Sequence, residues 1–273
     1  MPQFAANLSM LWNELPFLDR FAAAARAGFT AVEFLFPYEF EADDIAQRLK
    51  DHRLQLVLHN LPPGDWAAGE RGTACWPGRE DEFRAGVALA LQYAAVLGTP
   101  QLHCMAGIPP QGVSEAQARA TLVGNLRFAA TAARQQGVRL LLEPINRFDM
   151  PGFFINRPRQ AIALMDEVGS DNLFLQYDIY HAQRMEGELC NTIRELLPRI
   201  AHMQLADTPG RHEPGTGEIH YRHLFDFIDA LGYRGHIGCE YKPRDASPGG
   251  TDRGLAWVAA HGQTLAQRQG EPA

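Results

Sequence analysis

Four oxygen-bearing side chains stand at or near the ends of short apolar runs in the second half of the chain. They are Glu143, Asp178, Gln204 and Glu240. Three carboxylates crowded against an apolar wall repel one another unless a cation compensates their charge. Three carboxylates and one amide form an all-oxygen donor set, which suits Mg²⁺ or Mn²⁺ better than zinc. Together they predict a divalent-metal site, although any one acid could instead cap a helix or form a salt bridge.

Other polar residues are expected at the same edge of the molecule. His59 and His103 end two earlier apolar runs, and His181 follows Asp178 by three positions. Such histidines can bind a substrate oxygen or hydrogen-bond a metal-ligating carboxylate; for His181, capping the next helix is an equal alternative. Arg71 lies in a glycine-flanked segment and could reach a substrate carboxylate, the alternative being an ordinary solvated arginine.

Two further ionisable residues lie within apolar runs rather than at their ends. Glu33 lies inside an apolar run, where an unpaired carboxylate would be costly, so we expect a partner for it. His202 shares the inward parity of Gln204 but is two residues earlier, and we interpret it as a core histidine with its hydrogen bonds satisfied.

The elements that must position these residues are short runs rich in branched and aromatic side chains. Eight such runs cover residues 4–8, 31–36, 54–59, 101–105, 138–143, 173–178, 200–205 and 236–240. They start 23 to 47 residues apart, close to the ~30 or more residues of a strand–helix–strand unit. The pattern predicts eight strands with helices between them.

Residues typical of helix starts and helix ends lie between the apolar runs. Ser114 and Gln117 fit a capping box at the start of a helix that ends at Gly137. The other expected helices include 16–27, 80–97 and 254–266. Strands alternating with helices imply a parallel sheet covered by helices on the outside.

Closure into a single (β/α)8 TIM barrel is favoured over an open doubly wound sheet. Eight repeats match the barrel, and no G-x-G-x-x-G turn follows the first run. Strand ends meet at one face of a barrel, so Glu143, Asp178, Gln204 and Glu240 should converge there. We expect one domain over residues 1–268, a frayed tail over 269–273, and an irregular loop over 60–79 that closes over the site.

Composition narrows the function classes. The 273 residues hold 25 Lys and Arg against 32 Asp and Glu, a net charge of −7, and no basic run, which argues against nucleic acid. We find no signal peptide and no apolar run near the ~20 residues of a membrane span. Four widely spaced cysteines fit reduced thiols. We expect a soluble cytoplasmic protein without a membrane partner, and leave a homo-oligomer open.

Several motifs together resemble the hydroxypyruvate isomerase family, within the xylose-isomerase-like barrels. They are NLSM at 7–10, VEFLFPY at 32–38, HNLPPGDW at 59–66, EPIN at 143–146, QYDIYH at 176–181 and GTGE at 215–218. The resemblance spans nearly the whole chain. It implies a Mg²⁺ or Mn²⁺ site at Glu143, Asp178, Gln204 and Glu240, with Glu143 and Glu240 as acid–base residues.

The activity implied is the interconversion of hydroxypyruvate and tartronate semialdehyde through an enediolate. The neighbouring 2-oxo-tetronate isomerases look much the same, so the substrate is a hydroxy-oxo acid of three or four carbons. A ketose 3-epimerase and a non-catalytic metabolite-binding barrel are weaker alternatives. The related abasic-site endonucleases use a histidine-rich zinc cluster, and here Gln204 and the acidic net charge argue against that branch. The metal, the oligomeric state, the direction of flux and the choice between proton transfer and a hydride shift stay open.

Overall fold

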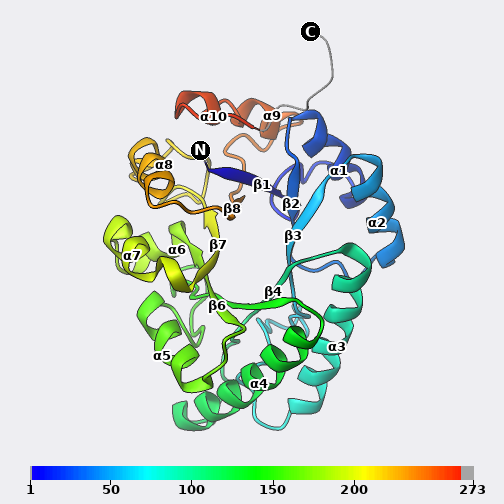
Figure 1. Ribbon diagram of the computed structural model, residues 1–273, viewed down its shortest axis with the longest axis vertical. Coiled ribbons are helices and arrows are strands. Elements are labelled where there is room, and N and C mark those ends of the chain that lie inside the picture. Colours follow the sequence, from blue (N-terminus) through cyan, green and yellow to red (C-terminus); the bar gives the residue numbers. More distant parts are fainter. Residues whose placement is uncertain (1, 266–273) are drawn as a thin grey trace.

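Eight parallel strands form a closed ring in the computed structural model, which describes residues 2–265 (Figure 1). Each strand pairs with its neighbours in chain order, and β8 pairs with β1. The strands are β1 (Gln3–Asn7), β2 (Ala31–Glu33), β3 (Gln55–Asn60), β4 (Gln101–Cys104), β5 (Arg139–Leu142), β6 (Leu173–Asp178), β7 (Ile200–Leu205) and β8 (His236–Cys239). The predicted TIM barrel is confirmed.

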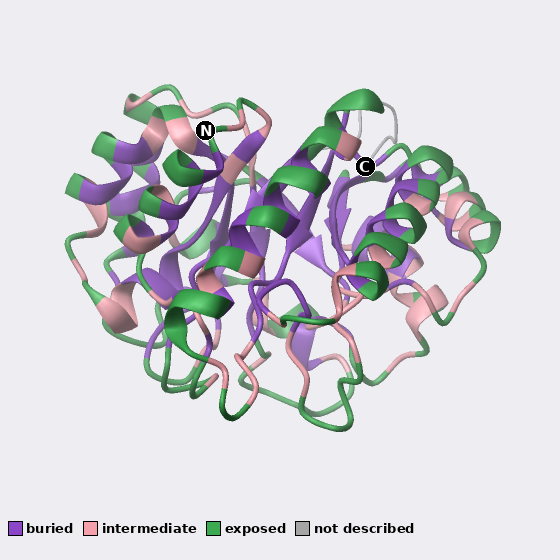
Figure 2. Ribbon diagram, turned by 90° about the horizontal axis from the view of Figure 1, so that it is seen from below, coloured by how far each residue is buried: buried purple, intermediate pink, exposed green. Residues whose placement is uncertain are grey.

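Helices surround this ring and present their exposed sides outward (Figures 1 and 2). They are α1 (Phe17–Arg26), α2 (Ala42–Asp51), α3 (Glu80–Leu97), α4 (Glu115–Gln135), α5 (Pro158–Val168), α6 (Ile179–Met185), α7 (Leu189–Leu196), the 3-10 helix η1 (Leu197–Arg199), α8 (Tyr221–Ala230), α9 (Gly250–Gly254) and α10 (Trp257–Ala260). Among the described residues, no helix is long and apolar enough to cross a membrane.

Local sequence signals account for several of these boundaries. The capping box at α4 is present, with reciprocal hydrogen bonds between Ser114 and Gln117. The helix expected over 254–266 is wrong, because the chain forms two short helices, α9 and α10, in its place. Trp257 lies at the start of α10, and its ring packs edge-on against that of Phe4, with ring centroids 5.2 Å apart. The expected frayed tail, 269–273, lies outside the described residues.

The barrel interior holds apolar side chains at one level and polar ones at the next. Ala5 and Ala31 belong to a buried cluster inside the barrel. Residues two apart along a strand share a face, so Asn7 and Glu33 follow Ala5 and Ala31 into the interior. The polar side chains therefore lie closer to the carboxyl ends of the strands than Ala5 and Ala31 do.

Strand register brings the acidic residues to one edge. Asp178, at the end of β6, pairs with Gln204 of β7. Glu143 directly follows β5 and Glu240 directly follows β8. The carboxyl ends of these strands all open onto the same face of the barrel, which therefore carries the candidate site.

Candidate active site

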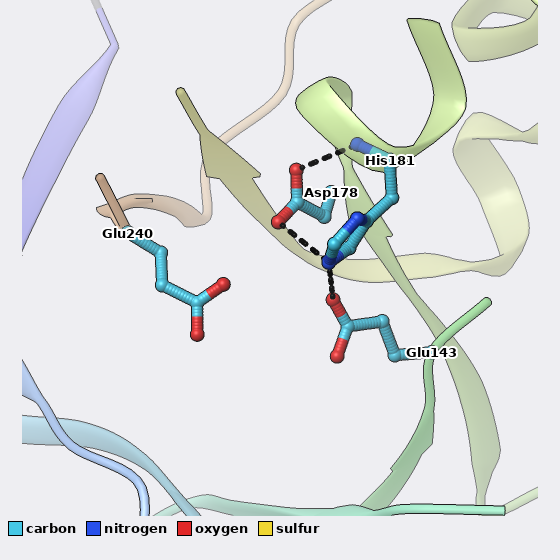
Figure 3. Close-up of side chains that lie close together, drawn as sticks. All are labelled: Glu143, Asp178, His181 and Glu240. Carbon is cyan, nitrogen blue, oxygen red and sulfur yellow. Dashed lines mark hydrogen bonds and ion pairs between the residues drawn. The ribbon is translucent and has the colours of Figure 1, made fainter. Parts of the chain in front are cut away.

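Glu143, Asp178, His181 and Glu240 form one compact cluster at the barrel mouth (Figure 3). Each offers a ligand atom, and these atoms all lie within 4.8 Å of one another. All four residues are buried. Glu240 reaches in from the side opposite Glu143 and Asp178 (Figure 3). Three of the four predicted metal ligands are thus brought together, with His181 beside them.

The backbone fixes how Asp178 presents its oxygens. Asp178 caps α6, and its Oδ1 accepts hydrogen bonds from the backbone N–H groups of Tyr180 (2.7 Å) and His181 (3.2 Å). Its Oδ2 is buried and makes no hydrogen bond within the described part of the chain. One oxygen therefore anchors the helix start while the other remains for a ligand.

The free oxygens are the feature that fits a cation. Glu143 Oε1 and Asp178 Oδ2 are both buried without a hydrogen-bond partner among residues 2–265. A buried acceptor left unsatisfied costs about 1–3 kcal/mol, and more if it is charged. A hard divalent ion prefers such carboxylate oxygens. The donor set therefore fits Mg²⁺ or Mn²⁺.

Burial and mutual repulsion set the protonation of these acids. Burial, followed by repulsion from Glu240 and Asp178, raises the pKa of Glu143 well above its ordinary value. Burial raises the pKa of Glu240 to about 8, although Arg211 opposes the shift. The pKa of Asp178 is also raised by burial. Without a cation, the cluster retains protons that its carboxyl groups would release in water.

Arg211 is a site residue that the sequence interpretation missed. Its Nη2 lies 2.5 Å from Glu240 Oε2 and 3.8 Å from Asp178 Oδ2. Burial lowers the pKa of the Arg211 guanidinium, but the attraction of Glu240 and Asp178 outweighs it and raises the pKa overall. Its backbone is left-handed, with φ +56°. The available signal was its position after the seventh strand, four residues before the GTGE motif.

Asp207 holds the loop that carries Arg211. The carboxylate of this buried residue accepts hydrogen bonds from the backbone N–H groups of four loop residues, which are Thr208, Gly215, Gly217 and Ile219. A Cβ at Gly217 would overlap the Thr208 carbonyl oxygen, so the close approach requires glycine. One carboxylate thus organises the loop around the guanidinium.

His181 has a defined tautomer. Asn146 Oδ1 accepts from the backbone N–H groups of Phe148 and Asp149, which leaves its Nδ2 to donate to His181 Nδ1 at 2.6 Å. Because burial, and then Arg211, lower the pKa of His181 well below its ordinary value, the ring is neutral. Its proton is therefore on Nε2, which lies 3.8 Å from Glu143 Oε1 and 3.7 Å from Asp178 Oδ2. His181 can donate a hydrogen bond into the site.

The predicted substrate-binding residues divide into two groups. His103 lines the same cavity as His181, and its Nε2 lies 3.5 Å from Glu143 Oε2. Burial lowers the pKa of His103 to about 3, so it too is neutral. His59 is not among the residues that line the cavity; it is fully buried, with Nδ1 3.2 Å from Thr99 Oγ1.

Arg71 and Gln204 are engaged elsewhere in the described structure. The Arg71 guanidinium stacks on the ring of Trp66, 3.8 Å from its centroid, and Trp66 lines the cavity. Gln204 does not face the cluster with a free amide: its Nε2 donates to Glu33 Oε1 and its Oε1 accepts from Gln176. The Gln204 oxygen retains a second lone pair, so the amide can still serve as a ligand.

The cavity above the cluster has a volume of about 360 Å³. Three cations, Arg184, Arg211 and Lys242, lie along its wall. Trp66, from the segment 61–79 between β3 and α3, forms part of the apolar wall. The arrangement suits a small anionic molecule held over the carboxylates.

Comparisons with known proteins show the family of the chain. Residues 21–261 match the family described as xylose isomerase-like TIM barrel. The hydroxypyruvate isomerase of Escherichia coli K12 is 53% identical over 258 residues, covering 94% of this chain and 98% of that protein. The 2-oxo-tetronate isomerase of Cupriavidus necator is 52% identical with the same coverage.

Solved structures share the fold at two levels of similarity. A structure titled AP endonuclease, family 2, from Brucella melitensis has a TM-score of 0.91 and 49% identity, covering 95% of this chain and 99% of that one. The D-psicose 3-epimerase of Clostridium cellulolyticum H10 has a TM-score of 0.79 at 16% identity, covering 98% of this chain and 100% of its own. The second likeness concerns the fold alone.

Proposed function

The chain belongs to the family of xylose isomerase-like TIM barrels, and from that premise we propose that it is a metal-dependent isomerase that interconverts hydroxypyruvate and tartronate semialdehyde. The observation that carries the proposal is the buried group of Glu143, Asp178 and Glu240 with Arg211 beside it. Carboxylates can move protons, and the guanidinium can hold an anionic substrate. The close relatives named as isomerases support the same reaction class.

The chemistry requires a proton to leave C3 of hydroxypyruvate and a proton to be added at C2, while the C3 hydroxyl becomes an aldehyde and the C2 ketone an alcohol. Glu143 and Glu240, on opposite sides of the cluster, are assigned the two proton transfers. The Nε2–H of His181 donates to a substrate oxygen on which negative charge develops. The neutral state of His181 suits a donor of this kind.

The metal ligands we propose are Glu143, Asp178, Gln204 and Glu240, with Mg²⁺ or Mn²⁺ as the ion. The unpartnered carboxylate oxygens support this set. A bound divalent ion would supply Lewis acidity that stabilises the negative charge of an enediolate. His181 uses Nδ1 to accept from Asn146 and so keeps its proton on the nitrogen that faces the carboxylates; we therefore assign it to substrate rather than to metal.

A carboxylate-bearing substrate accounts for the cations of the cavity. Arg211, Arg184 and Lys242 all line it. Arg211 and Arg184 are paired with Glu240 and Asp149 in the structure, and a substrate carboxylate would add a further partner that a neutral ketose cannot supply. Arg211 is the best placed of the three, because it already contacts Glu240. This charge favours a hydroxy-oxo acid over the substrate of a ketose 3-epimerase.

A four-carbon substrate is the second candidate. The 2-oxo-tetronate isomerase is as similar to this chain as the hydroxypyruvate isomerase, at 52% against 53% identity. The cavity, at about 360 Å³, has room for either acid. The two candidates share the same metal and proton chemistry and differ only in the length of the carbon chain.

A nuclease function is less well supported, although the Brucella melitensis structure carries an endonuclease title. Within residues 2–265, the histidine, cysteine and acidic side chains that could hold a metal gather in a single group. A three-zinc centre needs more ligands than that group offers. The net charge of −7 also opposes the approach of a phosphate backbone.

The cellular setting follows from less direct observations. The four cysteines are unpaired in the described structure, and unpaired thiols are typical of a reducing compartment. We place the protein in the cytoplasm and treat residues 1–268 as one domain.

The proposed function is tested with a substrate panel. Three- to five-carbon hydroxy-oxo acids and free ketoses are incubated with the protein and Mg²⁺ or Mn²⁺, and products are identified by NMR. We expect conversion of hydroxypyruvate that stops with a chelator and returns with metal. Turnover of ketoses alone would contradict the proposal. In D₂O, deuterium on the product carbon supports proton transfer, whereas its absence favours a hydride shift.

A further inference from the structure

A second polar group lies inside the barrel and touches the site through Gln204. At its centre is Glu33, which is fully buried. Its Oε1 accepts from Asn7 Nδ2 at 2.9 Å and from Gln204 Nε2 at 2.8 Å, and its Oε2 lies 2.6 Å from His202 Nε2. The partner expected for this acid is thus confirmed threefold. None of the proton-transfer steps above uses it.

The Glu33 carboxylate occupies space that a side chain at position 238 would otherwise fill. A Cβ at Gly238 would overlap the Glu33 carboxyl group, so a side chain on β8 is omitted where Glu33 reaches across. Gly238 is also the register partner of Gln204, and Gln204 is the register partner of Asp178. Glu33 therefore contacts the strand position that adjoins the carboxylate cluster.

The contact between Glu33 and Gln204 determines which end of the Gln204 amide faces the carboxylate. A carboxylate can only accept hydrogen bonds, so it selects the Nε2 end of the Gln204 amide and turns Oε1 away from itself. Gln176 Nε2 donates to that oxygen at 2.7 Å. The same oxygen keeps one lone pair for another partner.

Gln176 by itself does not determine the orientation of the Gln204 amide. Its own Oε1 is buried and has no hydrogen-bond partner in the described chain. If both amides turned over, Gln204 Nε2 could donate to this oxygen and the pair would remain bonded. The Gln204 amide has two hydrogen-bond partners within residues 2–265, Gln176 and Glu33, and of these Glu33 alone distinguishes its nitrogen from its oxygen.

We propose that Glu33 is a positioning residue: it fixes the amide of Gln204 so that an oxygen, not an N–H group, is available to the divalent ion. The inference rests on the proposed metal site and deepens it. An amide nitrogen that carries two hydrogens has no lone pair to offer a cation, so a reversed Gln204 would replace a ligand with a repelling dipole.

The central test compares two replacements of the same carboxylate. In Glu33→Met the carboxylate that accepts from Gln204 Nε2 is lost. The Gln204 amide can then turn over and donate from Nε2 to Gln176 Oε1, which regains a hydrogen bond for its nitrogen. In Glu33→Gln the charge is lost, but the new amide can keep its oxygen toward Asn7 and Gln204 while its nitrogen faces His202, whose unpartnered Nδ1 can take up the ring proton. The second variant is therefore the matched control for charge.

The readout is the dissociation constant for Mn²⁺, measured by titration calorimetry on the whole protein, with thermal unfolding as the check on folding. Loss of a residue that orients a metal ligand typically weakens metal binding about 10- to 100-fold, and we expect that loss in Glu33→Met. Glu33→Gln should stay close to the wild type. Adding Gln204→Glu to Glu33→Met should restore binding, because a carboxylate presents an oxygen in either orientation.

Each outcome of the Mn²⁺ titrations either supports or contradicts the positioning role of Glu33. Equal losses in Glu33→Met and Glu33→Gln would show that charge, not orientation, is what Glu33 supplies. Wild-type affinity in Glu33→Met, or no recovery in the double variant, would also overturn the inference. If the wild-type protein itself binds no Mn²⁺, the proposed metal site fails first, and this result is distinct from all the others.

Discussion

Arg211 Nη2 and Glu240 Oε2 lie 2.5 Å apart at the edge of the carboxylate cluster. The pair joins a loop residue after β7 to the residue that directly follows β8, and it places a permanent positive charge beside three buried acids. Both residues line the cavity. An anionic substrate that enters can therefore share the guanidinium with Glu240, and in doing so alter the environment of a proposed acid–base group.

Replacing Arg211 with Met should weaken the use of an acidic substrate. A hydrogen bond to a charged group contributes about 1.5–3 kcal/mol, so kcat/KM should fall about 10- to 150-fold, mostly through KM. Arg159→Met is the control, because Arg159 forms an exposed salt bridge with Glu195. Steady-state kinetics with hydroxypyruvate give the answer, and an unchanged KM would remove Arg211 from substrate binding.

Replacing either acid–base carboxylate with its amide should reduce turnover with little change in shape. General acid–base catalysis contributes about 10²–10⁴ in rate, and Glu143→Gln and Glu240→Gln should each lose at least that much in kcat. Glu195→Gln, on the surface, serves as the control. Full turnover in either site variant would show that the proton is handled by another group.

Stability of the metal-free protein should depend on pH through Glu240. Its pKa rises from an ordinary 4.5 to about 8 in the folded protein, so the folded state binds the proton more tightly than the unfolded state does. The contribution to stability is present below pH 4.5 and is lost as pH rises from 4.5 to about 8. Denaturant unfolding of the wild type and of Glu240→Gln across this pH range measures the contribution of Glu240 as the difference between their free energies of unfolding. We expect Mg²⁺ to offset the decline, since metal binds the ionised carboxylate.

The tautomer of His181 should depend on Asn146. In Asn146→Asp the donor to His181 Nδ1 becomes an acceptor, which draws the ring proton to Nδ1 and removes it from Nε2. Removing a donor aimed at developing negative charge costs about 10²- to 10³-fold in kcat, and we expect a loss of that order. The imidazole ¹⁵N chemical shifts report the tautomer directly. A loss of activity without a change in those shifts would contradict the explanation.

Gly238 should tolerate no side chain. A Cβ there would overlap the Glu33 carboxyl group, and overpacking of this kind costs about 1–3 kcal/mol. Gly124→Ala is the matched control: Gly124 is in α4, and an added Cβ meets no described atom within 4 Å apart from its chain neighbours and the nearby backbone of its own helix. That substitution should stabilise the helix by about 0.5–1 kcal/mol. Chemical denaturation measures both, and equal stabilities would show that Glu33 has room to move.

The sequence by itself determined the elements of the barrel. Runs of branched and aromatic residues are local signals, and the runs at 173–178 and 200–205 coincide with β6 and β7. The Ser114 and Gln117 capping box is equally local. Parallel strand ends must share one face, so the closeness of Glu143, Asp178 and Glu240 also followed from order along the chain.

Tertiary structure decided which side chains from distant parts of the sequence pair with one another. Glu33 and Gln204 are 171 residues apart, and Arg211 and Glu240 are 29 apart. No local pattern encodes such contacts, because they depend on the curvature of the closed sheet and on the path of a loop held by Asp207. The helix expected over 254–266 was also wrong, because the chain forms the two short helices α9 and α10 there instead. Residue types could name the donors of the site, but only the closed barrel could orient them.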